Sequence, residues 1–237
     1  MPYLDANGVH THYEEQGSGE PMLLLHGGGV GGDSFGDWIP WFAERHLVRV
    51  PDRRGQGQTP DVNGPLSYEG MARDTIAFIE ALGAERTHLV GWSDGGNIAL
   101  IIGALRPDLV RKIVAIGANA TVDGLTAAGR ASIAQFAADG SPFSAKLTDC
   151  WFDESYSIDL AAVAAPTLVV AGDDDIMSNA HTAWISESIP NAQLAIIPGA
   201  SHLVPLEKPE LLRTIFDTFL DGEAPQTLLP LRRAPAG

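Results

Sequence analysis

The feature that most constrains this chain is an apolar segment that runs directly into the pattern Gly-x-Ser-x-Gly. Residues 87–92 have the composition of a strand, Gly91, Ser93 and Gly95 form the pattern, and a helical pattern begins at once behind it. So short a connection forces the serine into a sharp turn, and the glycines remove Cβ atoms that would collide there. The hydroxyl then stands at a sheet edge and a helix N-terminus, which favours negative charge. We expect Ser93 to be a nucleophile; the alternative is a Gly-Ser-Gly turn without chemistry.

Strand and helix patterns alternate along the rest of the chain. The Asn7-Gly8 dipeptide between the first two strands indicates a hairpin, so the first edge of the sheet should be antiparallel. The other alternations predict an α/β fold with a mostly parallel, eight-stranded sheet and helices on both faces. The predicted strands are residues 3–4, 9–15, 21–26, 46–51, 87–92, 112–118, 166–171 and 193–197; the predicted helices are 35–43, 66–82, 94–106, 125–138, 142–152, 180–189 and 209–220.

The 237 residues fit one α/β domain, expected over residues 1–220. Residues 119–160 interrupt the alternation with two helical patterns, the second rich in aromatic side chains. An insertion there should cover the carboxyl ends of the strands, where open α/β sheets bind ligands, so it predicts a short helical lid. Residues 221–237 contain several prolines and few core residues, and are expected to form a loose tail.

Charge and composition exclude several classes of partner. The formal charge of −15 argues against binding to nucleic acid or to an anionic membrane surface. The longest apolar runs fall short of the ~18 residues that a membrane span needs. Cys150 is the only cysteine and has no neighbours at zinc spacing, so we expect neither a disulfide nor a metal site. With no leader pattern at the N-terminus, a cytoplasmic monomer or homodimer is expected.

A serine nucleophile needs a base, and the best candidate is His202. It lies in the segment Pro198-Gly199-Ala200-Ser201-His202, expected to be a loop between the last strand and the last helix. Such a loop can bring an imidazole to the serine at the carboxyl edge of the sheet. Other histidines are placed in the first hairpin, in strands or in a helix, and suit the role less well: His10, His12, His46, His88 and His181.

The acid that orients this base should follow the strand predicted at 166–171. Asp173, Asp174 and Asp175 stand together there, with few basic residues nearby to pair with all three. We expect Asp175 to be the acid because the loop has had room to turn by then; Asp174 is the alternative, and Asp173 should cap or stay solvated. Asn119 and Asp123, after the preceding strand, are weaker candidates.

The negative oxygen formed during attack on a carbonyl requires preorganised N–H donors. One should be the backbone amide of Asp94, directly after the nucleophile. The other should come from the glycine-rich loop at 26–29, where Gly28 has no Cβ to keep a substrate away. Phosphate binding by this loop is the alternative, although the lysine and serine or threonine of a phosphate-binding loop are missing.

The Asp94 side chain admits two interpretations. It could receive a cationic part of the substrate, such as an amino group, or it could complement the dipole of the helix that it begins. Further residues could line an acyl or alcohol pocket or could equally belong to the core or the lid: Phe35, Trp92, Phe143, Trp151, Met177 and Leu203.

Five motifs in this order resemble the α/β-hydrolase superfamily over roughly residues 3–220. They are HGGG at 26–29, DRRGQGQT at 52–59, GWSDG at 91–95, GDDD at 172–175 and GASH at 199–202. Haloalkane dehalogenases and epoxide hydrolases carry an aspartate at the place of Ser93, so the serine disfavours both reactions. Within the superfamily, VGWSDGG at 90–96 and GANA at 117–120 resemble the valacyclovir hydrolase (biphenyl hydrolase-like) group, although the lid is shorter here.

That group cleaves amino-acid esters, and the resemblance implies that Asp94 recognises the substrate amino group. Residues and resemblance together predict a cofactor-free hydrolase of small carboxylic esters, with the triad Ser93, His202 and Asp175. A lactonase or thiolactonase, a perhydrolase (cofactor-free haloperoxidase type) and a C–C hydrolase remain alternatives with the same residues. A small-molecule receptor of the same fold would bind its ligand and turn it over slowly or not at all.

Overall fold

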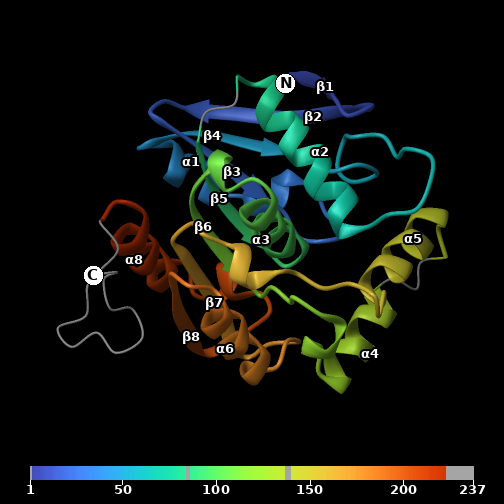
Figure 1. Cartoon of the computed structure of the whole chain (residues 1–237), viewed down its shortest axis with the longest axis vertical. Helices are drawn as coiled ribbons and strands as arrows, with labels where there is room; N and C mark the ends of the chain where they lie inside the picture. The colour runs from blue at the N-terminus through green and yellow to red at the C-terminus, as the bar shows by residue number, and fades with distance from the viewer. Residues whose placement is uncertain (1, 84–85, 137–139, 223–237) are drawn as a thin grey trace.

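One eight-stranded sheet organises the protein, as predicted (Figure 1). The computed structural model describes residues 2–83, 86–136 and 140–222, so the end of the helix predicted at 125–138 and nearly all of the predicted tail lie outside the described residues. The strand order is β1-β2-β4-β3-β5-β6-β7-β8. The strands are β1 (Tyr3–Ala6), β2 (Val9–Gly17), β3 (Glu20–Leu25), β4 (His46–Pro51), β5 (Thr87–Trp92), β6 (Val110–Ile116), β7 (Thr167–Asp174) and β8 (Ala192–Ser201).

The antiparallel pairings are confined to the first edge of the sheet, as the hairpin signal predicted. β1 pairs antiparallel with β2, and β2 with β4, while every later pair is parallel. The hairpin turns at Asn7 and Gly8, which both have positive φ angles (50° and 75°), as a two-residue turn of this kind requires.

Helices cover both faces because successive residues of a strand point to opposite sides. In β5, Leu89 joins the core beneath α2, α3 and α6, whereas Val90 joins the core beneath α1 and α8. Figure 1 shows α2, α3 and α6 on the near face of the sheet. The helices are α1 (Trp38–Ala43), α2 (Tyr68–Ala81), α3 (Asp94–Leu105), α4 (Ala127–Phe136), α5 (Pro142–Trp151), α6 (Asn179–Ser188), α7 (Val204–Glu207) and α8 (Pro209–Leu220).

The last two strands extend beyond their predicted ends, and this changes the surroundings of His202. Residues 198–201, expected in a loop, continue β8, and after an irregularity in β7 Asp174 pairs with Ser201. Gly172 permits this close approach, because a Cβ there would collide with the Ala200 carbonyl oxygen. Parallel pairing at this level places the residues that follow the two strands next to each other.

Residues 119–160 form a separate group of short elements beside the sheet, with α4 and α5 at one side of the molecule in Figure 1. An isolated bridge from Thr121 to Ser157 joins the two ends of the group, and a second, from Leu125 to Met177, ties the group to the segment that follows β7. The described residues also contain four 3-10 turns: η1 (Gly32–Phe35), η2 (Pro107–Leu109), η3 (Val122–Gly124) and η4 (Leu160–Ala162).

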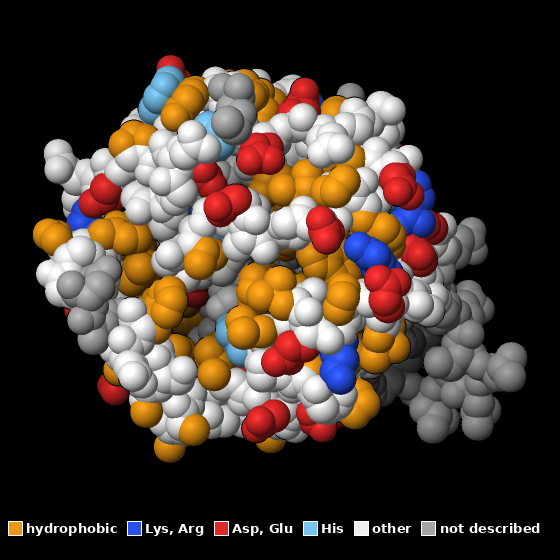
Figure 2. Space-filling view, turned by 180° about the vertical axis from the view of Figure 1, so that it is seen from behind, with side chains coloured by type: hydrophobic (Ala, Val, Ile, Leu, Met, Phe, Trp, Pro, Cys, Tyr) orange, Lys and Arg blue, Asp and Glu red, His pale blue; other side chains and the backbone are white. Residues whose placement is uncertain are grey.

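The surface is rich in acidic side chains, which are spread over the face drawn in Figure 2. This agrees with a sequence that has 30 acidic and 15 basic residues. Within the part of the chain that the structure describes, no helix is both long and apolar enough to cross a membrane.

Candidate active site

Ser93 occupies the strained turn that the glycine pattern predicted. Its φ and ψ angles are 56° and −121°, in a region that residues other than glycine rarely adopt. A Cβ at Gly91 would collide with the Gly95 carbonyl oxygen, and one at Gly95 with the Leu25 carbonyl oxygen. The Ser93 N–H donates to the Ile116 carbonyl oxygen on β6 (2.7 Å). The two strands beside β5 therefore hold the serine in place above the sheet.

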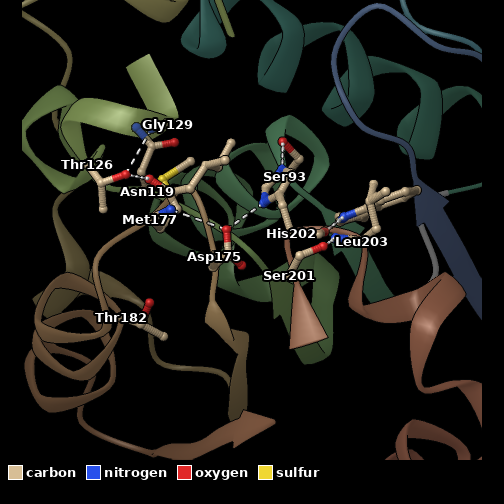
Figure 3. A network of polar contacts seen from close by, with 12 residues as sticks. Ser93, Asn119, Thr126, Gly129, Asp175, Met177, Thr182, Ser201, His202 and Leu203 are labelled. Atoms are coloured by element: carbon tan, nitrogen blue, oxygen red, sulfur yellow. Dashed lines mark hydrogen bonds and ion pairs between the residues drawn. The ribbon is translucent and has the colours of Figure 1, made fainter. Parts of the chain in front are cut away.

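A continuous chain of hydrogen bonds joins Ser93, His202 and Asp175 (Figure 3). The distance from Ser93 Oγ to His202 Nε2 is 3.0 Å, and His202 Nδ1 lies 2.7 Å from Asp175 Oδ1. The same Asp175 oxygen accepts from the Met177 N–H, and the Trp92 indole N–H donates to the His202 carbonyl oxygen. This is the arrangement in which a histidine can take a proton from a serine while a carboxylate fixes its tautomer.

The neighbouring acids lie elsewhere. Asp173 Oδ1 accepts from the Gly199 and Ala200 N–H groups and so caps the end of β8. Asp174 is exposed and lies at the edge of the cavity described below. The Asp123 carboxylate is fully exposed, 100 % by side chain. The side chains of Asn119 and Asn97 bond to each other. Of the five candidates for the acid, Asp175 is the one that contacts the imidazole.

Two backbone N–H groups at Ser93 are free to receive an oxygen. A Cβ at Gly27 would lie 3.6 Å from the Ser93 Cβ, so the loop at 26–29 passes directly over the serine. Gly29 donates its N–H to Gln56 Oε1 (2.8 Å). Among the described residues, by contrast, no hydrogen-bond acceptor is found for the N–H of Gly28 or of Asp94. The geometry thus leaves available the two amides named from the sequence.

A cavity of about 450 Å³ opens beside Ser93, within the usual range for small-molecule sites. It contains five of the seven residues proposed for the pocket: Trp92, Asp94, Trp151, Met177 and Leu203. The cavity is also lined by Ser93, His202 and Gly28, which were expected at the site, and by Asn119 and Asp174, which were considered as the acid. Its remaining lining residues were not proposed for the pocket: Gly27, Val30, Tyr68, Leu125, Ser132, Ile133, Phe136, Ile176 and Ser201.

Two aromatic residues expected in the pocket lie elsewhere. Phe35 is 3 % exposed and packs with Trp38 and Phe42 in the core beneath α1 and α8. Phe143, in the first turn of α5, lies against Gly55, where a Cβ would collide with its ring. Aromatic character alone could not separate these positions from Trp151, since the choice depends on which way η1 and α5 face.

The Asp94 carboxylate is buried at the inner wall of the cavity and already has two donors. The Tyr68 hydroxyl donates to Oδ1 (2.7 Å), and the Trp151 indole N–H lies 3.0 Å from Oδ2. Burial, followed by the charge of Asp94, raises the pKa of Tyr68 well above its usual value, so Tyr68 stays a neutral donor. These bonds connect α2 and α5 to the turn at Ser93. Nothing in the sequence signalled Tyr68, which is the first residue of its helix.

Among the residues that the structure describes, His, Cys, Asp and Glu side chains form no cluster of three suited to a metal ion. The Cys150 thiol is buried, which raises its pKa, and it has no disulfide partner.

Comparison with known proteins agrees with this geometry. Residues 20–140 match the family model described as alpha/beta hydrolase fold. Mouse serine hydrolase BPHL is 29 % identical, over 90 % of this chain and 84 % of that protein. The 2-hydroxy-6-oxo-6-(2'-aminophenyl)hexa-2,4-dienoic acid hydrolase of Metapseudomonas resinovorans is 27 % identical, over 94 % of this chain and 91 % of that protein.

The fold is also that of the enol-lactonase from Burkholderia xenovorans LB400. Its crystal structure superimposes with a TM-score of 0.80 and covers 93 % of this chain and 100 % of the other, at 18 % identity. The family match spans more than half of the chain and includes the glycine-rich loop and the turn at Ser93. This chain is therefore a hydrolase that belongs to the α/β-hydrolase fold family.

Proposed function

We propose that the protein hydrolyses small carboxylic esters through a covalent acyl-enzyme. Ser93 Oγ attacks the carbonyl carbon while His202 Nε2 takes its proton, and the N–H groups of Gly28 and Asp94 stabilise the negative oxygen. His202 then gives the proton to the departing alcohol oxygen. Next it activates a water molecule that releases the acid. Asp175 orients the imidazole throughout and stabilises its positive charge.

The observation that carries this proposal is the bonded series from Ser93 through His202 to Asp175 at the floor of an apolar cavity. A serine whose hydroxyl reaches an oriented imidazole is what acyl transfer requires. The N–H groups of Gly28 and Asp94, for which no acceptor is found among the described residues, supply the complementary part of the site.

The charges around the cavity favour esters over the carboxylate-bearing substrates of C–C hydrolases. The dienoic acid in the name of the Metapseudomonas relative carries a carboxylate. Asp94 and Asp174 line the cavity of this chain, and no lysine or arginine is found among its described lining residues. A substrate carboxylate would lose its hydration there without gaining a cationic partner. A lactone presents the same carbonyl without a charge and is therefore an alternative substrate.

A preference for amine-bearing esters is the finer part of the proposal. A carboxylate has about four lone-pair positions, and Tyr68 and Trp151 use only part of the capacity of Asp94. An ammonium group on the acyl side could therefore bind to Asp94 from the cavity. The test compares p-nitrophenyl esters of amino acids with simple acyl esters of equal length. Asp94→Asn should abolish any preference for the amine; equal rates for both classes in the wild type would exclude this role.

The insertion at 119–160 is proposed to act as a short lid over a single domain formed by residues 1–220. Ile133 and Phe136 of α4 and Trp151 of α5 line the cavity, so these helices cover the bound acyl group. A monomer or homodimer located in the cytoplasm remains the expectation for the whole protein.

The proposed chemistry is tested by Ser93→Ala in an assay of p-nitrophenyl acetate and butyrate. We expect activity to fall to background while the circular dichroism spectrum and melting temperature stay close to those of the wild type. Ser186→Ala is a control for the loss of a serine hydroxyl, because Ser186 is buried on α6, away from the site, and its hydroxyl donates to the Ala183 carbonyl oxygen. Turnover retained by Ser93→Ala would refute the assignment.

A further inference from the structure

Arg53 is a buried cation that forms no ion pair with a carboxylate of the described residues. It is 5 % exposed, and the ion pairs formed among the described residues do not include it. Burial lowers the pKa of Arg53, while the nearby charge of Asp94 raises it. An arginine remains protonated in such surroundings. Because an unpaired buried charge is costly, its hydrogen bonds should reveal what it contributes.

Those hydrogen bonds go to the backbone of the loop that passes over Ser93. Arg53 Nη1 donates to the His26 carbonyl oxygen, and Nη2 donates to the Gly27 carbonyl oxygen at 2.7 Å. The His26 ring strengthens the arrangement: its Nδ1 lies 2.7 Å from the same Gly27 oxygen, while its Nε2 accepts from the Arg53 N–H. Both side chains therefore hold the peptide that links Gly27 to Gly28.

Fixing one end of a peptide group also fixes the other. In a trans peptide the C=O and the following N–H are coplanar and point in opposite directions. With the Gly27 carbonyl oxygen turned toward Arg53, the Gly28 N–H is turned away from it. The next peptide is held as well, since Gln56 Oε1 accepts from the Gly29 N–H and lies 3.4 Å from Arg53 Nη2. Between these two anchored groups the Gly28 N–H has no acceptor within the part of the chain that the structure describes.

The charge of Arg53 also matters at this position. A Cβ on Gly28 would collide with Asp94 Oδ2, so a carboxylate lies close to the place where the negative oxygen would form. Like charges at short distance repel, most strongly away from water. A guanidinium at the carbonyl end of the Gly27–Gly28 peptide offsets that repulsion and polarises the N–H at the other end.

We propose that Arg53 is a positioning residue for the oxyanion site, which aims and polarises the Gly28 N–H through the Gly27 carbonyl without touching the substrate. The inference rests on the proposed acyl chemistry at Ser93. Arg53 should therefore affect the rate at which the negatively charged, tetrahedral species forms. It should not affect how tightly the neutral substrate binds.

The experiment measures the reaction of Ser93 with a fluorophosphonate, whose phosphoryl oxygen takes the place of the carbonyl oxygen and gains negative charge as the serine attacks. Arg53→Met should lower the maximal rate of phosphonylation by about 10- to 100-fold, below the effect of deleting a donor outright. The concentration for half-maximal rate should change less than about twofold, since ground-state binding is retained. Arg53→Lys keeps the charge but replaces the planar fork of donors by one compact ammonium nitrogen, so the phosphonylation rate should also fall by at least about fivefold.

Arg54→Met is the matched control. Arg54 is the next residue, is also largely buried and pairs with Asp74 (2.5 and 2.6 Å), but it has no bond to the loop at 26–29. The Arg54→Met variant should have a lower melting temperature than the wild type and the same phosphonylation rate. If Arg53→Met does not fold, the phosphonylation rate of Arg53→Lys tests the proposal instead.

The possible results separate the two proposals. A wild-type protein that reacts, with folded Arg53 variants that react equally fast, would overturn the role of Arg53 and leave the proposed function intact. The same holds if Arg54→Met loses as much rate as Arg53→Met. A wild-type protein that does not react with the fluorophosphonate would refute the proposed function and the role of Arg53 together.

Discussion

Gly117 lies against the imidazole of His202, and replacing it by alanine should displace the base. A Cβ at Gly117 would be 2.8 Å from His202 Cε1 and Nδ1, where ordinary contacts begin at 3.4 Å. The ring must therefore move by about 0.6 Å or the backbone must give. Gly117 also has a φ of +58°, which costs a residue with a Cβ about 1–2 kcal/mol. Misplacement of a reacting group on this scale lowers rates by up to about 100-fold.

We therefore expect Gly117→Ala to lower kcat for p-nitrophenyl butyrate by about 10- to 100-fold and the free energy of unfolding by about 1–2 kcal/mol. Gly8→Ala separates the two effects: Gly8 has a φ of +75°, and no atom lies within 4 Å of the position that a Cβ would take. It should lose similar stability in urea unfolding and keep the full kcat. A folded Gly117→Ala protein with wild-type kcat would show that the imidazole position does not depend on this contact.

The triad, the core and the buried histidines each allow a further test. Asp175→Asn should lower kcat by about 10⁴-fold and Asp174→Asn by less than about tenfold, since only Asp175 bonds to the imidazole; the reverse order would exchange their roles. Phe216→Ala should lower the free energy of unfolding by about 3–5 kcal/mol, because the ring is 1 % exposed in the core; urea unfolding measures this, and a loss below about 1 kcal/mol would contradict the packing. Burial lowers the pKa of His26 and His88 in the folded protein, so on acidification these histidines take up protons in the unfolded chain before they do in the folded one. The free energy of unfolding should therefore be level above about pH 7. It should fall below about pH 6.5, by up to about 1.4 kcal/mol per pH unit for each histidine. Stability that rises on acidification through this range would refute it.

The sequence was sufficient for features that depend on local geometry. The turn at Ser93 follows from two glycines within five residues of chain, and the hairpin from one Asn-Gly pair. The parallel order of the later strands follows from their alternation with helices. Each of these requires only neighbours in the chain to be known.

Features that depend on how distant segments meet were harder to predict. The pairing of Asp174 with Ser201 follows an irregularity in β7, which no local pattern announces. The burial of Arg53 could not be read from a stretch of polar residues, since arginine is usually exposed. Phe35 and Trp151 are both aromatic. The packing of η1 and α5 places Phe35 in the core and Trp151 at the cavity, and the sequence does not show this packing.

Because β7 pairs with β8, the contact between Asp175 and His202 depends on a strand at the edge of the sheet. Asp175 and His202 each follow directly on one of these strands, and β8 stands last in the strand order with a single neighbour. Regions with few neighbours open locally before the whole protein unfolds. Separation of this one pair of strands would part the acid from the base while the serine, held between β3 and β6, stayed in place. Activity would then be lost when β8 separates from β7. On heating, this loss of activity would occur before the core of the protein unfolds.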